Sequence, residues 1–194
     1  MRPARSDLHE ARGAARRLVA AWFALVAALF AGSASGQPLT GGADEVKAAY
    51  LYRFLAYVDW PDAAFAGPNA PLVIGVAGND AVAAELARVV VGRTAHGRPL
   101  AARRVAPGDA LDDVHVLYVG DAALLRAAWL QRARDRPLLI VADGFTALDA
   151  GAAIAFVLVE DRLRFDASLR AIDRAGLRVS SRLLALAQRV VGAP

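Results

Sequence analysis

The sequence has 194 residues and contains no cysteine, a single lysine and only three histidines. Without cysteine, the chain forms no disulfide and offers neither a thiolate ligand nor a thiol nucleophile. A zinc site needs three or four ligands, often on one motif, and the sequence contains neither HExxH nor HxH. No serine lies in a GxSxG pattern. The sequence therefore predicts no catalytic residue, no metal site and no cofactor.

Two of the histidines lie in the downstream part of the chain. His115 is within the apolar run VHVLYV and is expected to be a core histidine with a satisfied hydrogen bond. His96 lies in a glycine-flanked loop and is expected to be exposed.

The N-terminal segment has the three parts of an export signal. Five arginines precede an uncharged apolar run of 14 residues, Leu18–Ala31, and the small residues GSASG follow it. A membrane-spanning helix needs roughly 20 apolar residues, so a retained anchor is the less favoured alternative. We predict a cleaved signal peptide over residues 1–36, a Pro/Gly linker over residues 37–43 and a periplasmic location.

Removal of residues 1–36 changes the charge of the protein. The whole chain has 23 basic and 19 acidic residues, of which five and two lie in that segment. The remaining 158 residues therefore hold 18 basic and 17 acidic side chains, a net charge of +1. Nucleic-acid binding needs a clustered basic footprint, which this balance does not indicate. The length favours one domain, predicted over residues 44–194.

The segment EVKAAYLYRFLAYVDW, residues 45–60, predicts the first helix of the domain, with Asp44 as its N-cap. Its apolar stripe recurs at spacings of three and four residues, at Val46, Ala49, Tyr50, Phe54 and Tyr57. Three further apolar residues widen the stripe, so that burial on two sides is expected: Leu51, Leu55 and Val58. A residue before proline avoids the helical region, so the helix should end at Trp60-Pro61.

Downstream, runs of branched apolar residues alternate with helical segments. Strands are predicted over residues 71–78, 98–105, 114–120 and 137–143, with a hairpin over 153–159 and 162–166 that turns at Glu160-Asp161. Helices are predicted over residues 81–90, 122–134, 167–176 and 182–191. This alternation predicts an α/β fold, a three-layer sandwich with a mixed, mostly parallel sheet of about five to six strands and helices on both faces.

Two groups of side chains are candidates for binding a partner. Tyr52 falls off the main apolar stripe beside Arg53, and Trp60 closes the same aromatic segment. Aromatic and arginine side chains are the common anchors of protein interfaces. Arg162 and Arg164 lie in the charged hairpin, where they suit an acidic partner or ligand. The structural alternatives are a core role for the aromatic residues and a solvated face for the hairpin charges.

A small-ligand pocket is a further candidate. The segment GVAGND follows a predicted strand and opens a helix, and free backbone amides at such a junction can hold an anion. Gly75, Gly78 and Asn79 would line this pocket. The pattern is GxxG, without GxGxxG or a P-loop lysine, so a tight turn is the alternative.

The order of these segments resembles the YfiR family of periplasmic proteins. The resemblance runs from YLYRFLAYVDWP through PLVIGVAGND, VVVGRTAHGRPLAARRV, VHVLYVG and PLLIVADGF to GAAIAFVLVEDRLRFDASLRAIDRAGLRVSSRLLALA, and it covers about residues 44–191. Its most specific parts are the aromatic helix and the block from Arg164 to Ala187, and neither is a catalytic motif. Some members have cysteines where this chain has Gly75 and Val114, so no disulfide carries over. Ser168 stands where members tend to have asparagine.

The resemblance implies a non-enzymatic negative regulator. By similarity, the chain would bind and inhibit the periplasmic part of a membrane-bound diguanylate cyclase, which would lower cyclic-di-GMP signalling and biofilm formation. An OmpA-like outer-membrane lipoprotein would relieve the inhibition by sequestering the regulator. The resemblance also allows a homodimer. The alternative function is a small periplasmic ligand-binding module.

Overall fold

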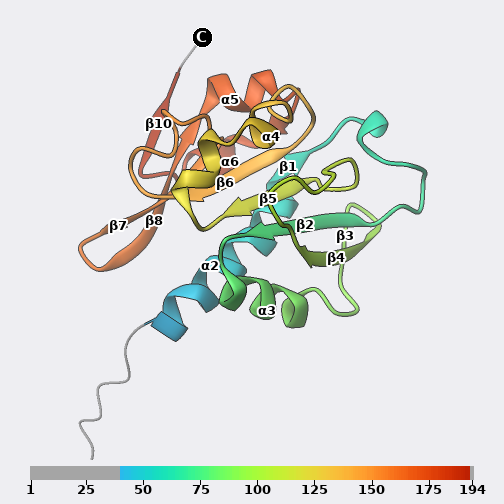
Figure 1. Cartoon of the computed structure of the whole chain (residues 1–194), viewed down its shortest axis with the longest axis horizontal. Coiled ribbons are helices and arrows are strands. Elements are labelled where there is room, and N and C mark those ends of the chain that lie inside the picture. Colours follow the sequence, from blue (N-terminus) through green and yellow to red (C-terminus); the bar gives the residue numbers. More distant parts are fainter. Residues whose placement is uncertain (1–39, 193–194) are drawn as a thin grey trace, which may run out of the picture. The chain divides into compact units, whose positions relative to one another are not determined.

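A computed structural model describes residues 40–192, so the predicted signal peptide, residues 1–36, lies outside the described residues. Eight strands form one sheet in the order β10-β8-β7-β6-β5-β2-β4-β3 (Figure 1). They are β2 (Leu72–Ala77), β3 (Thr94–Ala95), β4 (Arg98–Arg104), β5 (Val116–Val119), β6 (Leu139–Asp143), β7 (Ile154–Val159), β8 (Arg162–Ser168) and β10 (Arg189–Val191). Within this sheet, only β7–β8 and β3–β4 pair antiparallel. The predicted mixed, mostly parallel sheet is confirmed, with eight strands in place of five to six.

Helical segments cover both faces of this sheet, which confirms the predicted three layers. One core contains apolar side chains of α2 (Thr40–Phe54), α3 (Asp80–Val89), α5 (Leu169–Arg174) and α6 (Ser181–Leu184). The core on the other face contains side chains of η3 (Ala122–Arg126) and α4 (Ala128–Gln131). Among residues 40–192, no helix has the length and apolarity needed to cross a bilayer.

The first helix has other boundaries than those predicted. Helix α2 begins at Thr40, ahead of the predicted cap Asp44, and ends at Phe54. A 3-10 turn, η1 (Leu55–Tyr57), follows, and the chain then enters the short strand β1 (Val58–Asp59). Strand β1 pairs antiparallel with β9 (Arg178–Val179), and this pairing draws the chain out of the helix before Trp60 is reached. A second 3-10 turn, η2 (Asp62–Ala64), comes after it.

Three predicted helices are shorter or interrupted. The segment 167–176 is helical only in α5, because Ala167 and Ser168 still belong to β8. The segment 122–134 contains η3 and α4, separated by Ala127 in an extended conformation. The segment 182–191 is helical only in α6, because its end forms strand β10 and pairs parallel with β8. The guanidinium of Arg189 donates to the buried carboxylate of Asp166 at 2.9 Å, so the sheet edge and this ion pair outweigh the helical periodicity.

Apart from the cap at Asp44, the predicted turns and caps agree with the structure. Glu160 and Asp161 have φ values of 50° and 57°, as a two-residue hairpin turn of the primed type requires. The Asn79 side chain accepts a hydrogen bond from the Val82 amide at 2.9 Å and caps α3. Gly176 has a φ of 65°, as expected just beyond the end of α5.

Candidate functional site

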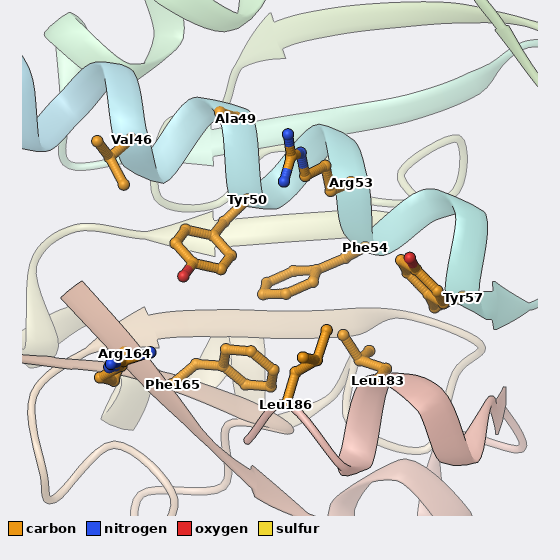
Figure 2. Close-up of a pocket in the computed structure, with 10 residues that line it drawn as sticks. All are labelled: Val46, Ala49, Tyr50, Arg53, Phe54, Tyr57, Arg164, Phe165, Leu183 and Leu186. Carbon is orange, nitrogen blue, oxygen red and sulfur yellow. The ribbon is translucent and has the colours of Figure 1, made fainter. Parts of the chain in front are cut away.

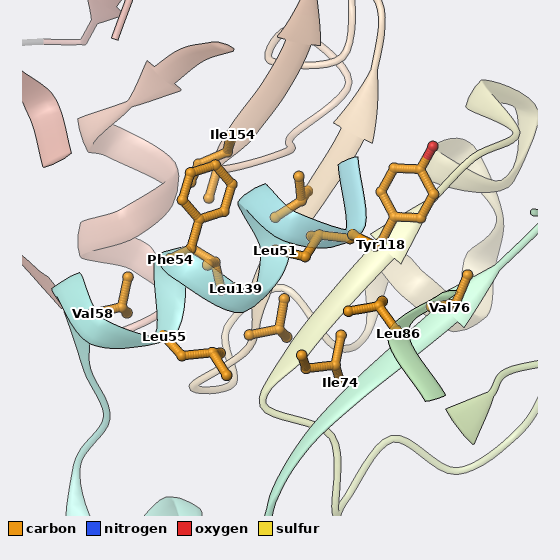
Figure 3. Packing of buried hydrophobic residues seen from close by; sticks show 14 of the residues in the cluster. Leu51, Phe54, Leu55, Val58, Ile74, Val76, Leu86, Tyr118, Leu139 and Ile154 are labelled. Carbon is orange, nitrogen blue, oxygen red and sulfur yellow. The ribbon is translucent and has the colours of Figure 1, made fainter. Parts of the chain in front are cut away.

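Helix α2 and the turn after it have one buried face and one face that solvent reaches. The buried face packs against the sheet and α3 through residues with no exposed surface, which are Ala48, Leu51, Leu55 and Val58. Figure 3 shows the last three of these among the side chains of the core. On the other face, Val46 is 43% exposed, and Tyr50 and Tyr57 are half-buried. The expectation of burial on two sides is therefore wrong for the outer part of the predicted stripe, because only short segments from the end of the chain cover it.

This second face forms one wall of a groove of about 440 Å³ (Figure 2). Strand β8 and helix α6 form the opposite wall. The groove is lined by Val46, Ala49, Tyr50, Arg53, Phe54, Tyr57, Arg164, Phe165, Leu183 and Leu186. We refer to these ten residues as the α2–α6 groove.

The floor of the α2–α6 groove is aromatic and buried. Phe54 and Phe165 meet edge to face with ring centroids 5.2 Å apart, and Tyr50 contacts Phe165 at 6.0 Å. Leu183 completes the buried floor, whereas Leu186 on the rim is 64% exposed. Figure 2 shows Tyr50 and Phe54 of α2 projecting toward the opposite wall, which carries Leu183 of α6 and Leu186 just beyond that helix.

Backbone pairing holds the two walls of the groove together. Val58 of β1 faces Val179 of β9, and the Ser180 amide donates to the Tyr57 carbonyl at 2.8 Å. The Ser180 hydroxyl then accepts from the Arg182 amide at 3.3 Å and caps α6. Because these bonds join the end of α2 to the start of α6, the backbone of the fold itself holds the two walls of the groove in position.

The groove carries positive charge on its rim. Arg53 and Arg164, distant in sequence, both line it and both are exposed. No carboxylate is among its lining residues. Neither arginine forms a salt bridge with another residue of the described range 40–192. An apolar floor with two uncompensated cations is suited to a partner that is itself apolar and acidic.

The other predicted partner-binding residues lie outside the groove lining. The Arg93 guanidinium lies over the ring of Tyr52 at 4.8 Å from its centroid, so this half-buried tyrosine already has a cation–π partner. Arg162 is exposed at the start of β8. Trp60 packs between the two described histidines, with centroid distances of 6.5 Å to His96 and 6.4 Å to His115.

His115 is a core histidine, as predicted, and its ring holds the loop that follows Trp60. Its Nδ1 accepts a hydrogen bond from the Val73 amide at 3.2 Å, and its Nε2 lies 3.1 Å from the Ala64 carbonyl. This pattern assigns the proton to Nε2 of a neutral ring. Phe65 stacks on the imidazole at 4.4 Å. Burial lowers the pKa of His115 below its ordinary value of 6.5, because the charged form loses its hydration.

The predicted ligand junction is closely packed. A Cβ atom at Gly75 would lie 2.8 Å from the Val105 side chain, so this buried position in β2 needs glycine. Gly78 has a φ of 73°, a backbone conformation that favours glycine. Besides capping α3, Asn79 donates from Nδ2 to Asp44 at 3.1 Å. These residues therefore have structural roles, and a ligand at this junction stays a prediction.

Sequence reasoning missed a polar cluster around the only lysine. Lys47 Nζ lies 2.6 Å from Asp143 Oδ2, and the Tyr118 hydroxyl donates to the same oxygen at 2.8 Å. Burial and the nearby Asp143 carboxylate raise the pKa of Tyr118 above its ordinary value of 10.0. The cluster joins α2 to the carboxyl ends of β5 and β6, the edge at which open α/β sheets bind ligands. A lone lysine in an arginine-rich chain was the available signal.

Two serines near the end of the chain have structural roles as helix caps. Within residues 40–192, no three side chains of the metal-binding types are grouped to hold an ion. The Ser168 hydroxyl accepts from the Ala171 amide at 3.3 Å and caps α5, as Ser180 caps α6.

The fold and the site define a three-layer α/β domain with an apolar groove that has cations on its rim. A family model described as YfiR/HmsC-like matches residues 44–188, and the chain therefore belongs to the YfiR/HmsC-like family. This family is periplasmic and is known as regulatory rather than catalytic. No curated protein matches the chain at a significant level of sequence similarity.

Proposed function

We propose that this protein is a non-enzymatic periplasmic regulator that binds and inhibits the periplasmic part of a membrane-bound diguanylate cyclase. Its effect is to lower cyclic-di-GMP signalling. The observation that carries the proposal is the α2–α6 groove, where Arg53 and Arg164 stand beside exposed apolar side chains with no carboxylate to neutralise them. Membership of a regulatory periplasmic family supports the same function.

The export signal predicted over residues 1–36 determines how such a regulator acts. A periplasmic protein is separated from the cytoplasmic nucleotide by the inner membrane. Any influence on cyclic-di-GMP therefore passes through a partner that spans this membrane. An OmpA-like outer-membrane lipoprotein is proposed as the second partner, which relieves inhibition by competing for the regulator.

A complementation experiment tests this function. In a strain with a cognate membrane cyclase, deletion of the gene should raise cyclic-di-GMP and biofilm, and wild-type protein should restore both. The Arg53→Glu/Arg164→Glu double variant should fail to restore them, because reversed charges repel an acidic partner. Arg162→Glu, on the same hairpin but outside the groove lining, is the matched control and should complement. Unchanged nucleotide levels in the deletion strain would disprove the proposal.

A small-ligand-binding module is the second candidate function. The volume of the α2–α6 groove, about 440 Å³, is within the range of small-molecule sites. A screen of periplasmic metabolites by thermal shift tests this alternative. Saturable stabilisation that is lost in the Arg53→Glu/Arg164→Glu variant would favour it, and stabilisation that this variant retains would place the ligand elsewhere.

A further inference from the structure

We propose that the α2–α6 groove receives one amphipathic α-helix of a partner protein, whose apolar face is flanked by acidic residues. The proposal deepens the regulatory function above and rests on it for the partner's periplasmic location. Its basis is the shape, the chemistry and the charge of the groove.

The shape of the groove matches a short helix. Six residues of α2 and the turn after it line the groove, at intervals of three, one, three, one and three positions. They are Val46, Ala49, Tyr50, Arg53, Phe54 and Tyr57. They form one helical face from Val46 to Tyr57, a length of about 17 Å or three turns at 1.5 Å per residue. A helix that binds in a groove uses anchors at positions i, i+3 or i+4, and i+7, which span about 11 Å and therefore fit within the length of this wall.

The chemistry of the groove favours large apolar anchors. The floor formed by Phe54, Phe165 and Leu183 is already desolvated, and its two phenylalanine rings meet edge to face. Leu186 and Val46 lie on opposite walls and stay exposed in the free protein. Apolar side chains from a partner would remove this surface from water, and that burial would drive binding.

The charge of the groove selects acidic flanks. Arg53 comes from the α2 wall and Arg164 from the β8 wall, so one cation lies on each side of the apolar floor. A bound helix with a carboxylate on each flank of its apolar face would place one acid near each arginine. A basic helix would face like charges on both walls, which disfavours it.

The same features argue against a second copy of this chain as the occupant. A two-fold dimer brings a surface against itself. A groove that faces its own copy is left unfilled, and the arginines of both copies would gather in one apolar interface without carboxylates. The occupant is therefore a convex segment of another polypeptide.

Model peptides test the proposal on the purified mature protein. The probe is a fluorescein-labelled helical peptide of about 14 residues, or four turns, with leucines at i, i+4 and i+7 and glutamates on both flanks. Its two counterparts have lysine or glutamine in place of every glutamate. Fluorescence anisotropy should show the acidic peptide binding at least about tenfold more tightly than the lysine peptide. Equal binding of the acidic and lysine peptides would overturn the proposal.

Charge reversal on the protein provides the decisive comparison. Arg53→Glu/Arg164→Glu should reverse the preference so that the lysine peptide binds better, whereas Arg162→Glu should keep the original order. The thermal melting temperature of each variant verifies folding. If the double variant does not fold, Arg53→Gln/Arg164→Gln replaces it, and this variant should bind the acidic and the lysine peptide with similar affinity. A preference that survives either double variant would overturn the proposal.

Other occupants give distinct results. If dodecanoate binds in the groove and no peptide does, the ligand is a small amphiphile and the helix proposal is wrong. If sedimentation shows a dimer that Leu186→Glu dissociates, the groove is a self-interface and the proposal is also wrong.

The proposal and the regulatory function can fail separately. If the peptides follow the charge rule but gene deletion leaves cyclic-di-GMP unchanged, the groove proposal stands and the function proposed above falls. If deletion raises cyclic-di-GMP but Arg53→Glu/Arg164→Glu complements fully, the function stands and the groove proposal falls.

Discussion

Helix α2 takes part in two clusters of aromatic and basic side chains that differ in one respect. At the sheet edge, Lys47 is paired with Asp143, and the Tyr118 hydroxyl donates a second hydrogen bond to the same carboxylate. In the α2–α6 groove, Arg53 and Arg164 stand beside an aromatic floor without an acidic partner among the described residues. The charge of the first cluster is therefore neutralised within the chain, whereas the two arginines of the second can pair with acidic groups of another molecule.

This difference distinguishes structural residues from candidate binding residues. A buried charge is costly unless it is paired and hydrogen-bonded, so the cluster at Lys47 serves to dock the helix on the sheet. An exposed arginine needs no internal partner, and its charge remains available for recognition. Substitutions in the first cluster should therefore change stability, and substitutions in the second should change binding.

The largest expected effect contrasts the two faces of α2. Leu51→Ala should lower the free energy of unfolding by about 2–5 kcal/mol, because it leaves a cavity in a site with no exposed surface. Leu186→Ala on the groove rim should change it by less than about 0.5 kcal/mol. Urea unfolding followed by circular dichroism measures both. Equal losses would show that the groove rim is as tightly packed as the core, which would remove the contrast.

The next effect compares the two kinds of cation directly. Lys47→Met should cost about 1.5–3 kcal/mol, since Asp143 then loses a charged hydrogen-bond donor at a site where the lysine side chain is only 16% exposed. Arg53→Met should leave stability nearly unchanged and weaken acidic-peptide binding. Chemical denaturation and anisotropy on the same samples provide the two measurements. A stable Lys47→Met variant would mean that the cluster does not anchor α2.

A smaller effect is the pH dependence of the free energy of unfolding that comes from the buried His115. Its pKa is lowered in the folded state, so the unfolded chain takes up a proton first as the pH falls through about 6.5. The unfolded state then binds more protons, and stability should decrease from pH 7.5 toward pH 5. The decrease should stop once the folded-state pKa is passed.

His115→Gln removes this titration and should flatten the part of the pH profile that His115 causes. His96→Gln is the control, since His96 is exposed and contacts Leu55 from its own loop. Trp60 fluorescence follows the region, because its indole donates to the His115 carbonyl at 3.1 Å. An unchanged profile in His115→Gln would assign the pH dependence to other groups.

The smallest expected effect on stability comes from the two hairpin arginines. Arg162→Ala and Arg164→Ala should each change the free energy of unfolding by less than about 0.5 kcal/mol, because both side chains are exposed. Only Arg164→Ala should weaken acidic-peptide binding, since only Arg164 lines the groove. Equal loss of binding in the two variants would extend the binding surface along the hairpin.

Local chemistry allowed much of this fold to be predicted from the amino-acid order. Branched apolar runs gave the central strands, Asn79 gave the start of α3, and Glu160-Asp161 gave the hairpin turn. These features depend on neighbours in sequence, so patterns and propensities are sufficient to find them. Family membership followed from the same segments. Arg53 and Arg164 were identified as candidates from their types and positions, although nothing local indicated that they share a groove.

Long-range pairing decided the rest. Strand β10 exists because β8 offers an open edge and Asp166 holds Arg189, although the segment has a helical period. Helix α2 ends early because β1 finds β9 far along the chain. Whether an apolar stripe becomes core or a binding surface depends on what covers it, and a period of three and four residues is the same in both cases. Tyr50 and Tyr57 are half-buried because α6 lies beside α2 without covering it fully, and the space between the two helices is the groove.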